Sequence, residues 1–274
     1  MHILLLKALN EQASGPHDDP YVQVLVKAGF TADLAETLDF TYHTAELARC
    51  QSWRDNHSAI VFTSPRAVTA YTKAGLKGQQ SDLCFVVGPS TDVQAKKAGF
   101  SPKGAQAGDA ETLSKVIVDN YANQLTKPVF FPASQIHRAD LPQYLEKNGI
   151  KVDILIAYSS HENVALKDKV RLNLCEGNPI PDCIVFFSPS GVTLTESILK
   201  TELKPHRPKV KLVAMGRATA SKLQEYDMNV AGVAASPRPE SLLQVIQRLA
   251  DDRWLFVSPT IKDGRLRMRY YAVC

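Results

Sequence analysis

The chain contains one strand-ending phrase twice. Residues 60–68 read IVFTSPRAV and residues 184–192 read IVFFSPSGV, so six of nine positions agree at an offset of 124 residues. A continuous apolar run that stops at Ser-Pro is typical of a buried strand followed directly by a helix, because serine caps helices and proline fits their first turn. The repeat therefore predicts a duplicated strand–helix unit.

Two further pairs follow in the same order. The turn GPST at 88–91 matches GRAT at 216–219 at an offset of 128 residues, and ETL at 111–113 matches ESL at 240–242 at an offset of 129. One such match can arise by chance, but three in order at a nearly constant offset indicate duplication.

Apolar runs alternate with helical patterns over most of the chain. Strands without polar alternation are buried on both faces, as in parallel sheets that are covered by helices. The hydrophobic share of 45% and the mean hydropathy of −0.15 fit a globular protein. We therefore expect an α/β fold with two parallel-sheet domains. The predicted strands lie within 2–8, 59–64, 83–88, 128–132, 152–158, 183–191 and 211–216.

Residues 34–42 do not form a continuous apolar run like those of the other predicted strands. Leu38, Phe40 and Tyr42 alternate with polar residues, as in an exposed antiparallel strand. If 184–250 mirrors 60–120, the second half lacks an opening strand, and the apolar run at the N-terminus can supply it. The first domain is then discontinuous. The predicted division is a first domain at 1–33 and 165–252, a second at 43–151, and a two-stranded antiparallel ladder at 34–42 and 152–164.

The C-terminal residues 253–274 fall outside the repeat. RLRMRYY at 265–271 alternates arginine with apolar residues after the turn signal Asp263-Gly264. A small hairpin and an unstructured tail both remain open for this extension.

Composition excludes several classes of protein. The net charge of +4 is too small to indicate nucleic-acid binding, but it suits an anionic ligand if the cations cluster. The five cysteines form no CxxC or Cys/His pattern, which predicts a reduced, cytoplasmic chain without structural zinc. No apolar run approaches the ~18 residues of a membrane span, so no membrane partner is expected.

In open parallel sheets, ligands bind beyond the carboxyl ends of the strands, where helix starts present backbone N–H groups to anions. A serine or threonine at one such start is usually only a helix cap. Several starts on matching edges of two domains could together hold a ligand with many negative groups. The predicted binding residues are Lys7, Ser64, Arg66, Gly88, Ser90, Thr91, Arg138, Ser188, Ser190, Gly191, Arg217, Thr219 and Ser236.

Standard catalytic signatures are missing from the sequence, which has no GxSxG, GxxxxGK[ST], GxGxxG or HExxH. Tyr158 is the candidate for chemistry, because it closes the apolar run VDILIA where the chain turns polar. A phenol there could donate a hydrogen bond to a leaving hydroxyl without a metal. A packed tyrosine with a solvated hydroxyl explains the position equally well.

The chain resembles the uroporphyrinogen-III synthase family, and its eukaryotic members most closely. The resemblance rests on an ordered set of segments rather than on one diagnostic motif. These are LLLK at 4–7, IVFTSPRAV at 60–68, VVGPST at 86–91, FPASQIHRADLPQYLEKNGI at 131–150, LIAYSS at 155–160, IVFFSPSGV at 184–192, GRATA at 216–220 and ASPRPESL at 235–242.

This resemblance implies two flavodoxin-like domains that are joined by a β-ladder, the first domain being discontinuous. It also implies the dehydration and closure of the linear tetrapyrrole hydroxymethylbilane in haem biosynthesis, with inversion of ring D through a spiro-pyrrolenine. The enzyme would be a monomeric lyase that uses no cofactor or metal.

By the same resemblance, Tyr158 matches the family's tyrosine that is proposed to assist loss of the hydroxyl. Thr91 and Thr219 match the threonines of its two Gly-x-x-Thr turns. Ala218 stands where family members often have a threonine, so a role for that position is in doubt. The alternative is a non-catalytic α/β protein that binds or senses a polyanionic small molecule.

Overall fold

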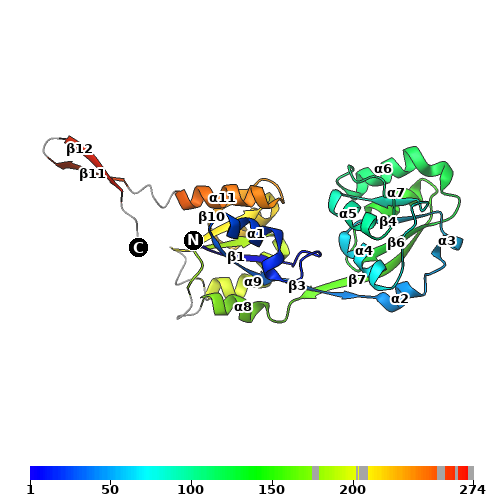
Figure 1. The fold of residues 1–274 in the computed structure, drawn as a ribbon, viewed down its shortest axis with the longest axis horizontal. Helices are drawn as coiled ribbons and strands as arrows, with labels where there is room; N and C mark the ends of the chain where they lie inside the picture. Colours follow the sequence, from blue (N-terminus) through cyan, green and yellow to red (C-terminus); the bar gives the residue numbers. More distant parts are fainter. Residues whose placement is uncertain (175–178, 202, 204–208, 252–256, 263–264, 271–274) are drawn as a thin grey trace. The chain divides into compact units, whose positions relative to one another are not determined.

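The structure is a computed structural model. It describes residues 1–174, 179–201, 203, 209–251, 257–262 and 265–270 (Figure 1). The chain divides into two compact units, which we describe one at a time. Unit 1 comprises Met1–Asp39 and Glu162–Cys274, and unit 2 comprises Phe40–His161.

Unit 1 is built on a five-stranded sheet in the order β10-β9-β8-β1-β2. All its neighbouring strands are parallel, and the order 2-1-3-4-5 along the chain is that of flavodoxin-like sheets. The strands are β1 (His2–Lys7), β2 (Thr31–Glu36), β8 (Cys183–Phe186), β9 (Lys211–Met215) and β10 (Val230–Ala234). The helices are η1 (Pro16–Asp18), α1 (Pro20–Lys27), α8 (Leu166–Leu174), α9 (Pro189–Thr201), α10 (Arg217–Glu225) and α11 (Pro239–Asp251).

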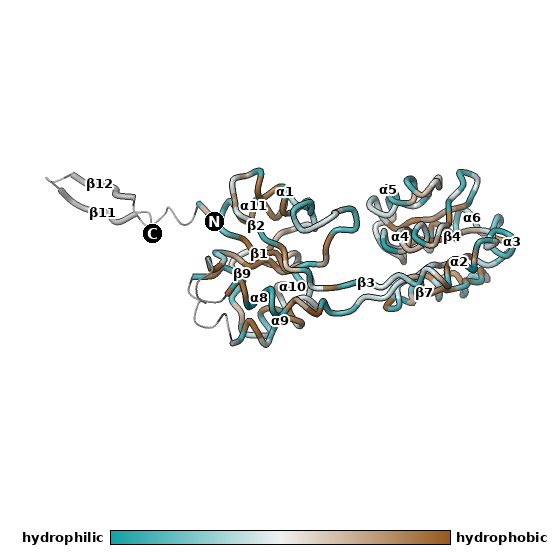
Figure 2. Tube along the Cα trace, turned by 60° about the horizontal axis from the view of Figure 1, so that its bottom comes forward, coloured by the Kyte–Doolittle hydropathy of each residue, from teal (hydrophilic) through white to brown (hydrophobic). Residues whose placement is uncertain are grey.

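The central strand β1 shows why unit 1 has three layers. Ile3 and Leu5 pack into the cluster that contains residues of α1 and α11, whereas Leu4 and Leu6 pack into the cluster with α8, α9 and α10. Successive side chains of a strand point to opposite faces, so an uninterrupted apolar strand requires helices on both sides. Figure 2 shows this strand as a hydrophobic segment inside its unit.

Unit 2 contains a second five-stranded sheet in the order β3-β7-β6-β4-β5. Its strands are β3 (Leu38–Tyr42), β4 (Ala59–Phe62), β5 (Cys84–Val86), β6 (Val129–Ser134) and β7 (Val152–Glu162). Its helices are α2 (Thr44–Ala48), α3 (Trp53–Asn56), α4 (Pro65–Lys73), α5 (Pro89–Lys97), α6 (Ala110–Tyr121), η2 (Ala122–Gln124) and α7 (Asp140–Lys147). On one face the strands pack against α4 and α5, and on the other against α6 and α7.

Strands β3 and β7 lie next to each other and run in opposite directions. The His43 N–H donates to the Ala157 carbonyl at 2.9 Å, and the Asn163 N–H donates to the Thr37 carbonyl at 3.2 Å. Residue numbers fall along one segment as they rise along the other, which is an antiparallel register.

The two sheets share one arrangement. β4 lies between β5 and β6, as β8 lies between β9 and β1. Beyond β5, Lys103 forms a parallel bridge to Phe85, in the place that β10 has beyond β9. The repeated phrase therefore marks the equivalent strands β4 and β8, and the predicted α/β fold with two parallel sheets is confirmed.

Three local expectations are wrong. Residues 34–42 are not one exposed strand, because β2 is a parallel neighbour of β1 that buries Ala32, Leu34 and Ala35, and β3 begins only at Leu38. The strand β10 was not expected, since its sequence VAGVA is short and half-exposed. The strand that carries Tyr158 is longer than the apolar run at 152–158, because β7 continues to Glu162 alongside β3.

The C-terminal extension contains an antiparallel pair in which β11 (Val257–Lys262) lies opposite β12 (Arg265–Tyr270). The hairpin is thus the alternative that the structure contains, and the turn residues 263–264 lie outside the described residues. No helix in the described part of the chain is long and apolar enough to cross a membrane.

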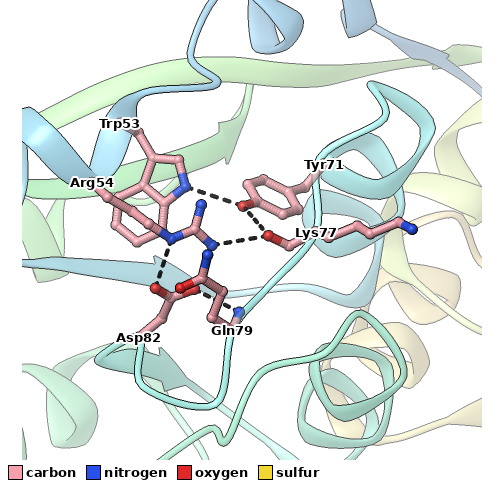
Figure 3. A network of polar contacts seen from close by, with 6 residues as sticks. All are labelled: Trp53, Arg54, Tyr71, Lys77, Gln79 and Asp82. Atoms are coloured by element: carbon pink, nitrogen blue, oxygen red, sulfur yellow. Dashed lines mark hydrogen bonds and ion pairs between the residues drawn. The ribbon is translucent and has the colours of Figure 1, made fainter.

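A polar network closes the amino edge of the sheet in unit 2 (Figure 3). Arg54 binds both carboxylate oxygens of Asp82, at 2.8 and 2.6 Å, and also donates to the Lys77 carbonyl. The buried Trp53 indole donates to the Tyr71 hydroxyl at 3.1 Å, which in turn donates to the same carbonyl. These bonds fix the segment that leads into β5 against α3 and α4.

Candidate functional site

The two helix starts after the repeated phrase have the same capping geometry. In unit 2, Ser64 Oγ accepts the Ala67 N–H at 3.2 Å, and in unit 1 Ser188 Oγ accepts the Gly191 N–H at 3.1 Å. Both serines are half-buried at the carboxyl edge of their sheet. Each satisfies one of the N–H groups that a helix start leaves without a partner. Capping therefore accounts for one bond of each hydroxyl.

The hydroxyls of Ser64 and Ser188 differ in their second partner. Ser188 Oγ lies 3.0 Å from Ser190 Oγ, on its own helix start. Ser64 Oγ lies 2.9 Å from the phenol oxygen of Tyr158, which comes from β7, 94 residues further along the chain. Only the contact in unit 2 joins a helix cap to a group that can transfer a proton.

Tyr158 is held firmly within unit 2. Its side chain is 8% exposed, and its carbonyl accepts the Gln135 N–H at 2.8 Å. The rings of Phe40 and Tyr42, both on β3, lie 6.3 and 6.5 Å from the Tyr158 ring. The Tyr158 ring is thus packed within unit 2, with its phenol oxygen at the start of α4.

Two cationic side chains of α4 lie over the rings of Phe40 and Tyr42, which pack near Tyr158. The Arg66 guanidinium lies 3.8 Å from the centre of the Phe40 ring, and Lys73 Nζ lies 4.1 Å from the centre of the Tyr42 ring. Such contacts attract a cation to the face of an aromatic ring. Arg66 lies in the first turn of α4, at the positive end of the helix dipole, whereas Lys73 is the last residue of the helix.

The two Gly-x-x-Thr turns present backbone rather than threonine hydroxyls. Thr91 and Thr219 are 3% and 2% exposed, and the Thr219 hydroxyl donates to the Met215 carbonyl at 3.0 Å. Gly216 has φ +84°, a conformation that favours glycine, at the start of α10. The half-buried Gly88 and the exposed Ser90 and Arg217 are the accessible parts of these turns.

Lys7 is engaged inside unit 1. It forms an ion pair with Asp19, and the two side chains are 9% and 0% exposed. Its ammonium lies 5.5 Å from the centre of the Tyr21 ring and 5.6 Å from that of Phe187. Burial, with the charges of Asp19 and Glu240, raises the pKa of Tyr21 to about 12. In this position the Lys7 ammonium compensates the charge of the buried Asp19 carboxylate.

The remaining predicted residues lie at the periphery. Arg138 is exposed and pairs with Asp140 at 2.7 Å. The Ser236 hydroxyl accepts from Arg238 Nε at 3.2 Å. The structure thus brings Ser64, Arg66 and Tyr158 together in unit 2. It brings Ser188, Ser190 and Gly191 together in unit 1.

Sequence reasoning missed the residues that surround Tyr158. Phe40 and Tyr42 were recognised as one face of an alternating strand, but nothing linked that strand to Tyr158. Lys73 falls two turns beyond the helix start, so a search for strand-end residues passes over it. For Lys7, the Asp19-Pro20 pair is a helix-start signal, but its packing against β1 is tertiary.

The described residues hold no group of three or more His, Cys, Asp or Glu side chains that are placed to bind a metal ion. What they offer instead is hydrogen-bond donors, fixed cations and one buried phenol at the carboxyl edge of unit 2. This arrangement suits the binding of carboxylates and the transfer of a proton.

The chain matches the family model described as uroporphyrinogen-III synthase HemD over residues 19–244. It is 26% identical over 208 residues to a curated uroporphyrinogen-III synthase from Saccharomyces cerevisiae, with 69% of this chain and 74% of the yeast protein covered.

Two solved structures have a similar fold. Uroporphyrinogen-III synthetase from Helicobacter pylori has a TM-score of 0.58 at 16% identity, covering 90% of this chain and 99% of that chain. A mutant uroporphyrinogen III synthase from Thermus thermophilus has a TM-score of 0.52 at 17% identity, covering 92% and 99%.

Proposed function

The chain belongs to the uroporphyrinogen-III synthase HemD family, and on that premise we propose that it is a lyase that converts hydroxymethylbilane to uroporphyrinogen III. Ring D is inverted through a spiro-pyrrolenine intermediate. The observation that carries this proposal is the family match, because residues 19–244 include the helix starts of both repeats and Tyr158.

The chemistry of the substrate fits the site residues. The bilane carries eight carboxylates, and helix starts, such as that of α4 with Arg66 in its first turn, are groups that bind carboxylates. The pyrroles are electron-rich and expel the hydroxyl readily. The main task of the protein is therefore to hold the chain so that ring D attacks through its substituted carbon, which is catalysis by proximity and orientation.

We assign to Tyr158 the proton that converts the leaving hydroxyl to water. The pyrrole nitrogen lone pair expels the hydroxyl as the carbon–oxygen bond breaks, and the phenol proton joins the departing oxygen. The azafulvenium that forms can return its N–H proton to the phenolate. Burial and packing against Phe40 restrict the Tyr158 ring, so the phenol needs little rearrangement to act as a donor.

The product isomer tests the proposal. The protein is incubated with hydroxymethylbilane, the product is oxidised, and the isomers are separated by chromatography. We expect the type III isomer, whereas spontaneous closure without protein gives type I. Type I alone in the presence of folded protein would refute the synthase activity and favour the non-catalytic polyanion binder.

Tyr158→Phe tests the proton donor. We expect a slower turnover with an intact fold, because the ring packing is retained and only the phenol oxygen is removed. Tyr144→Phe, on α7 and outside the cluster around Tyr158, is the matched control and should turn over normally. Unchanged turnover in Tyr158→Phe would remove the catalytic role of the phenol.

The proposal also includes a monomeric enzyme in the cytoplasm. Light scattering after size-exclusion chromatography tests the first part.

A further inference from the structure

One hydrogen bond separates the two otherwise equivalent helix caps. Ser64 and Ser188 each accept the backbone N–H of the residue three positions further along, at 3.2 and 3.1 Å. The second contact of the Ser188 hydroxyl is with Ser190 in the same helix start. Capping therefore does not require the serine to contact a distant strand. Ser64 instead reaches the phenol oxygen of Tyr158 at 2.9 Å. This contact is the difference that needs an explanation.

We propose that Ser64 is the positioning residue for Tyr158 in the reaction, donating its hydroxyl proton to the phenol oxygen. The inference rests on the proposed function. It replaces the predicted role of Ser64 in substrate binding by a role that acts through another side chain. A carboxylate of the substrate does not need to touch Ser64 for this role.

The direction of the Ser64–Tyr158 bond follows from the cap. Ser64 Oγ already accepts the Ala67 N–H, so one of its two lone pairs is occupied. An accepted hydrogen bond polarises the hydroxyl, which makes it a better donor and its oxygen a poorer acceptor. The positive end of α4 acts in the same sense. Either hydroxyl can be the donor in this contact, and the cap favours Ser64, which leaves the phenol proton for the leaving group.

The same bond acts on the charge that develops during the reaction. As the phenol proton moves to the departing hydroxyl, negative charge accumulates on the Tyr158 oxygen. Ser64 Oγ lies 2.9 Å from that oxygen, and the hydrogen bond between the two strengthens as the negative charge on the phenol oxygen grows. An interaction that is stronger in the transition state than in the bound substrate raises kcat without changing KM.

The first test compares two serines that flank β4. Ser64→Ala removes the hydroxyl at the carboxyl end, and Ser58→Ala removes one at the amino end, where Ser58 Oγ accepts the Lys127 N–H at 2.8 Å. We expect Ser64→Ala to lower kcat by about two- to twelvefold with KM unchanged, the effect of one net hydrogen bond. Ser58→Ala should leave both constants unchanged.

Two further Ser64 variants keep the test independent of folding. Glycine is nearly as good a cap as serine, so Ser64→Gly should keep the helix start and still lower kcat. Ser64→Thr keeps the hydroxyl and should restore most of the lost rate. A loss of kcat that follows thermal stability rather than the presence of a hydroxyl would overturn the proposal.

A double variant separates positioning from substrate binding. In the Tyr158→Phe background, Ser64→Ala should have no further effect, because the group through which Ser64 acts is gone. Full additivity of the two losses, or a raised KM with unchanged kcat, would show a direct role toward substrate and overturn the proposal.

The contact is also measurable without turnover. With ¹³Cζ-labelled tyrosine, the Tyr158 resonance, assigned by its loss in Tyr158→Phe, should shift in Ser64→Ala and not in Ser58→Ala. No shift would overturn the proposal. Unchanged kcat in Tyr158→Phe would overturn it as well, while the isomer assay would still report the synthase activity by itself.

Discussion

Replacing Lys7 by methionine should destabilise unit 1 rather than weaken ligand binding. The methionine keeps the length and most of the packing of the side chain, and removes the charge that faces Asp19. The predicted role of Lys7 toward a ligand and its observed place in the core give opposite expectations for this variant.

The magnitude follows from the burial of Asp19. Its side chain is 0% exposed and keeps two backbone donors in the variant, Tyr21 N–H at 3.0 Å and Asn10 N–H at 3.2 Å, but no compensating cation from Lys7. Leaving one member of a buried ion pair costs about 3–5 kcal/mol. That is a large part of the ~5–15 kcal/mol by which domains are usually stable.

Urea unfolding measures the loss in the free energy of unfolding. Far-UV circular dichroism follows both units. Trp53 fluorescence in a Trp254→Phe background follows unit 2 alone, so a loss that is confined to unit 1 can be recognised. Asp19→Asn in the Lys7→Met background removes the unpaired charge. The double variant should therefore be at least about 1 kcal/mol more stable than Lys7→Met.

A loss below about 1 kcal/mol in Lys7→Met would refute this reasoning, as would a further loss when Asp19 is also neutralised. Either result, together with a raised KM for the bilane, would return Lys7 to the ligand-binding residues.

The remaining predictions concern the fold. Burial and nearby carboxylates raise the pKa of Tyr21 from its ordinary value of 10.0 to about 12. The stability that the protonated phenol contributes is therefore complete below pH 10 and is lost as the pH rises toward 12. Tyr21→Phe should reduce this decline when urea unfolding is measured as a function of pH. Tyr71→Phe leaves the buried Trp53 N–H without its acceptor and should cost about 1–3 kcal/mol in the same assay. Gly216→Ala, at φ +84° and ψ 163°, a region that is almost restricted to glycine, should lower stability by about 1–3 kcal/mol.

Local chemistry was enough to predict the buried parallel strands of both sheets and many helix starts, but not the parallel edge strands β2 and β10. The strands β4 and β8 are buried over their whole length, and Ser64 marks the start of α4 by its own hydrogen bond. The edge strands were less clear. Residues 31–36 carry only three buried side chains, and their polar alternation resembles that of the ladder strand that follows.

The site could be predicted only as far as local signals reach. A serine before Pro65 is a cap in any context, but its contact with Tyr158 depends on the order of three strands. The buried state of Thr91 and Thr219 is likewise a result of helix packing against the sheet. Sequence places such groups at an edge, and tertiary packing decides which of them face a ligand.

The registers of the two sheets explain why the phenol occurs in one unit only. Ile60 and Ile184 are equivalent in the repeat, and their sheet partners are Phe130 and Leu4. One strand further, these partners pair with Asp153 and Asp33, so the two aspartates are equivalent positions of β7 and β2. The pairing is supported by their histidines, since His57 Nε2 lies 3.0 Å from Asp153 and His2 Nε2 lies 2.7 Å from Asp33.

From these aspartates the strands run to Tyr158 in unit 2 and to Thr37 in unit 1, with one extra residue at the register shift of β7. Thr37 is buried, and its methyl group lies 3.7 Å from the point where a Cβ on Gly191 would stand, beside the Ser188 cap. The shorter side chain fills the equivalent space without carrying a phenol to the serine. Duplication thus supplies two equivalent helix starts, and because a tyrosine stands in place of a threonine, the phenol that we propose as proton donor lies in unit 2.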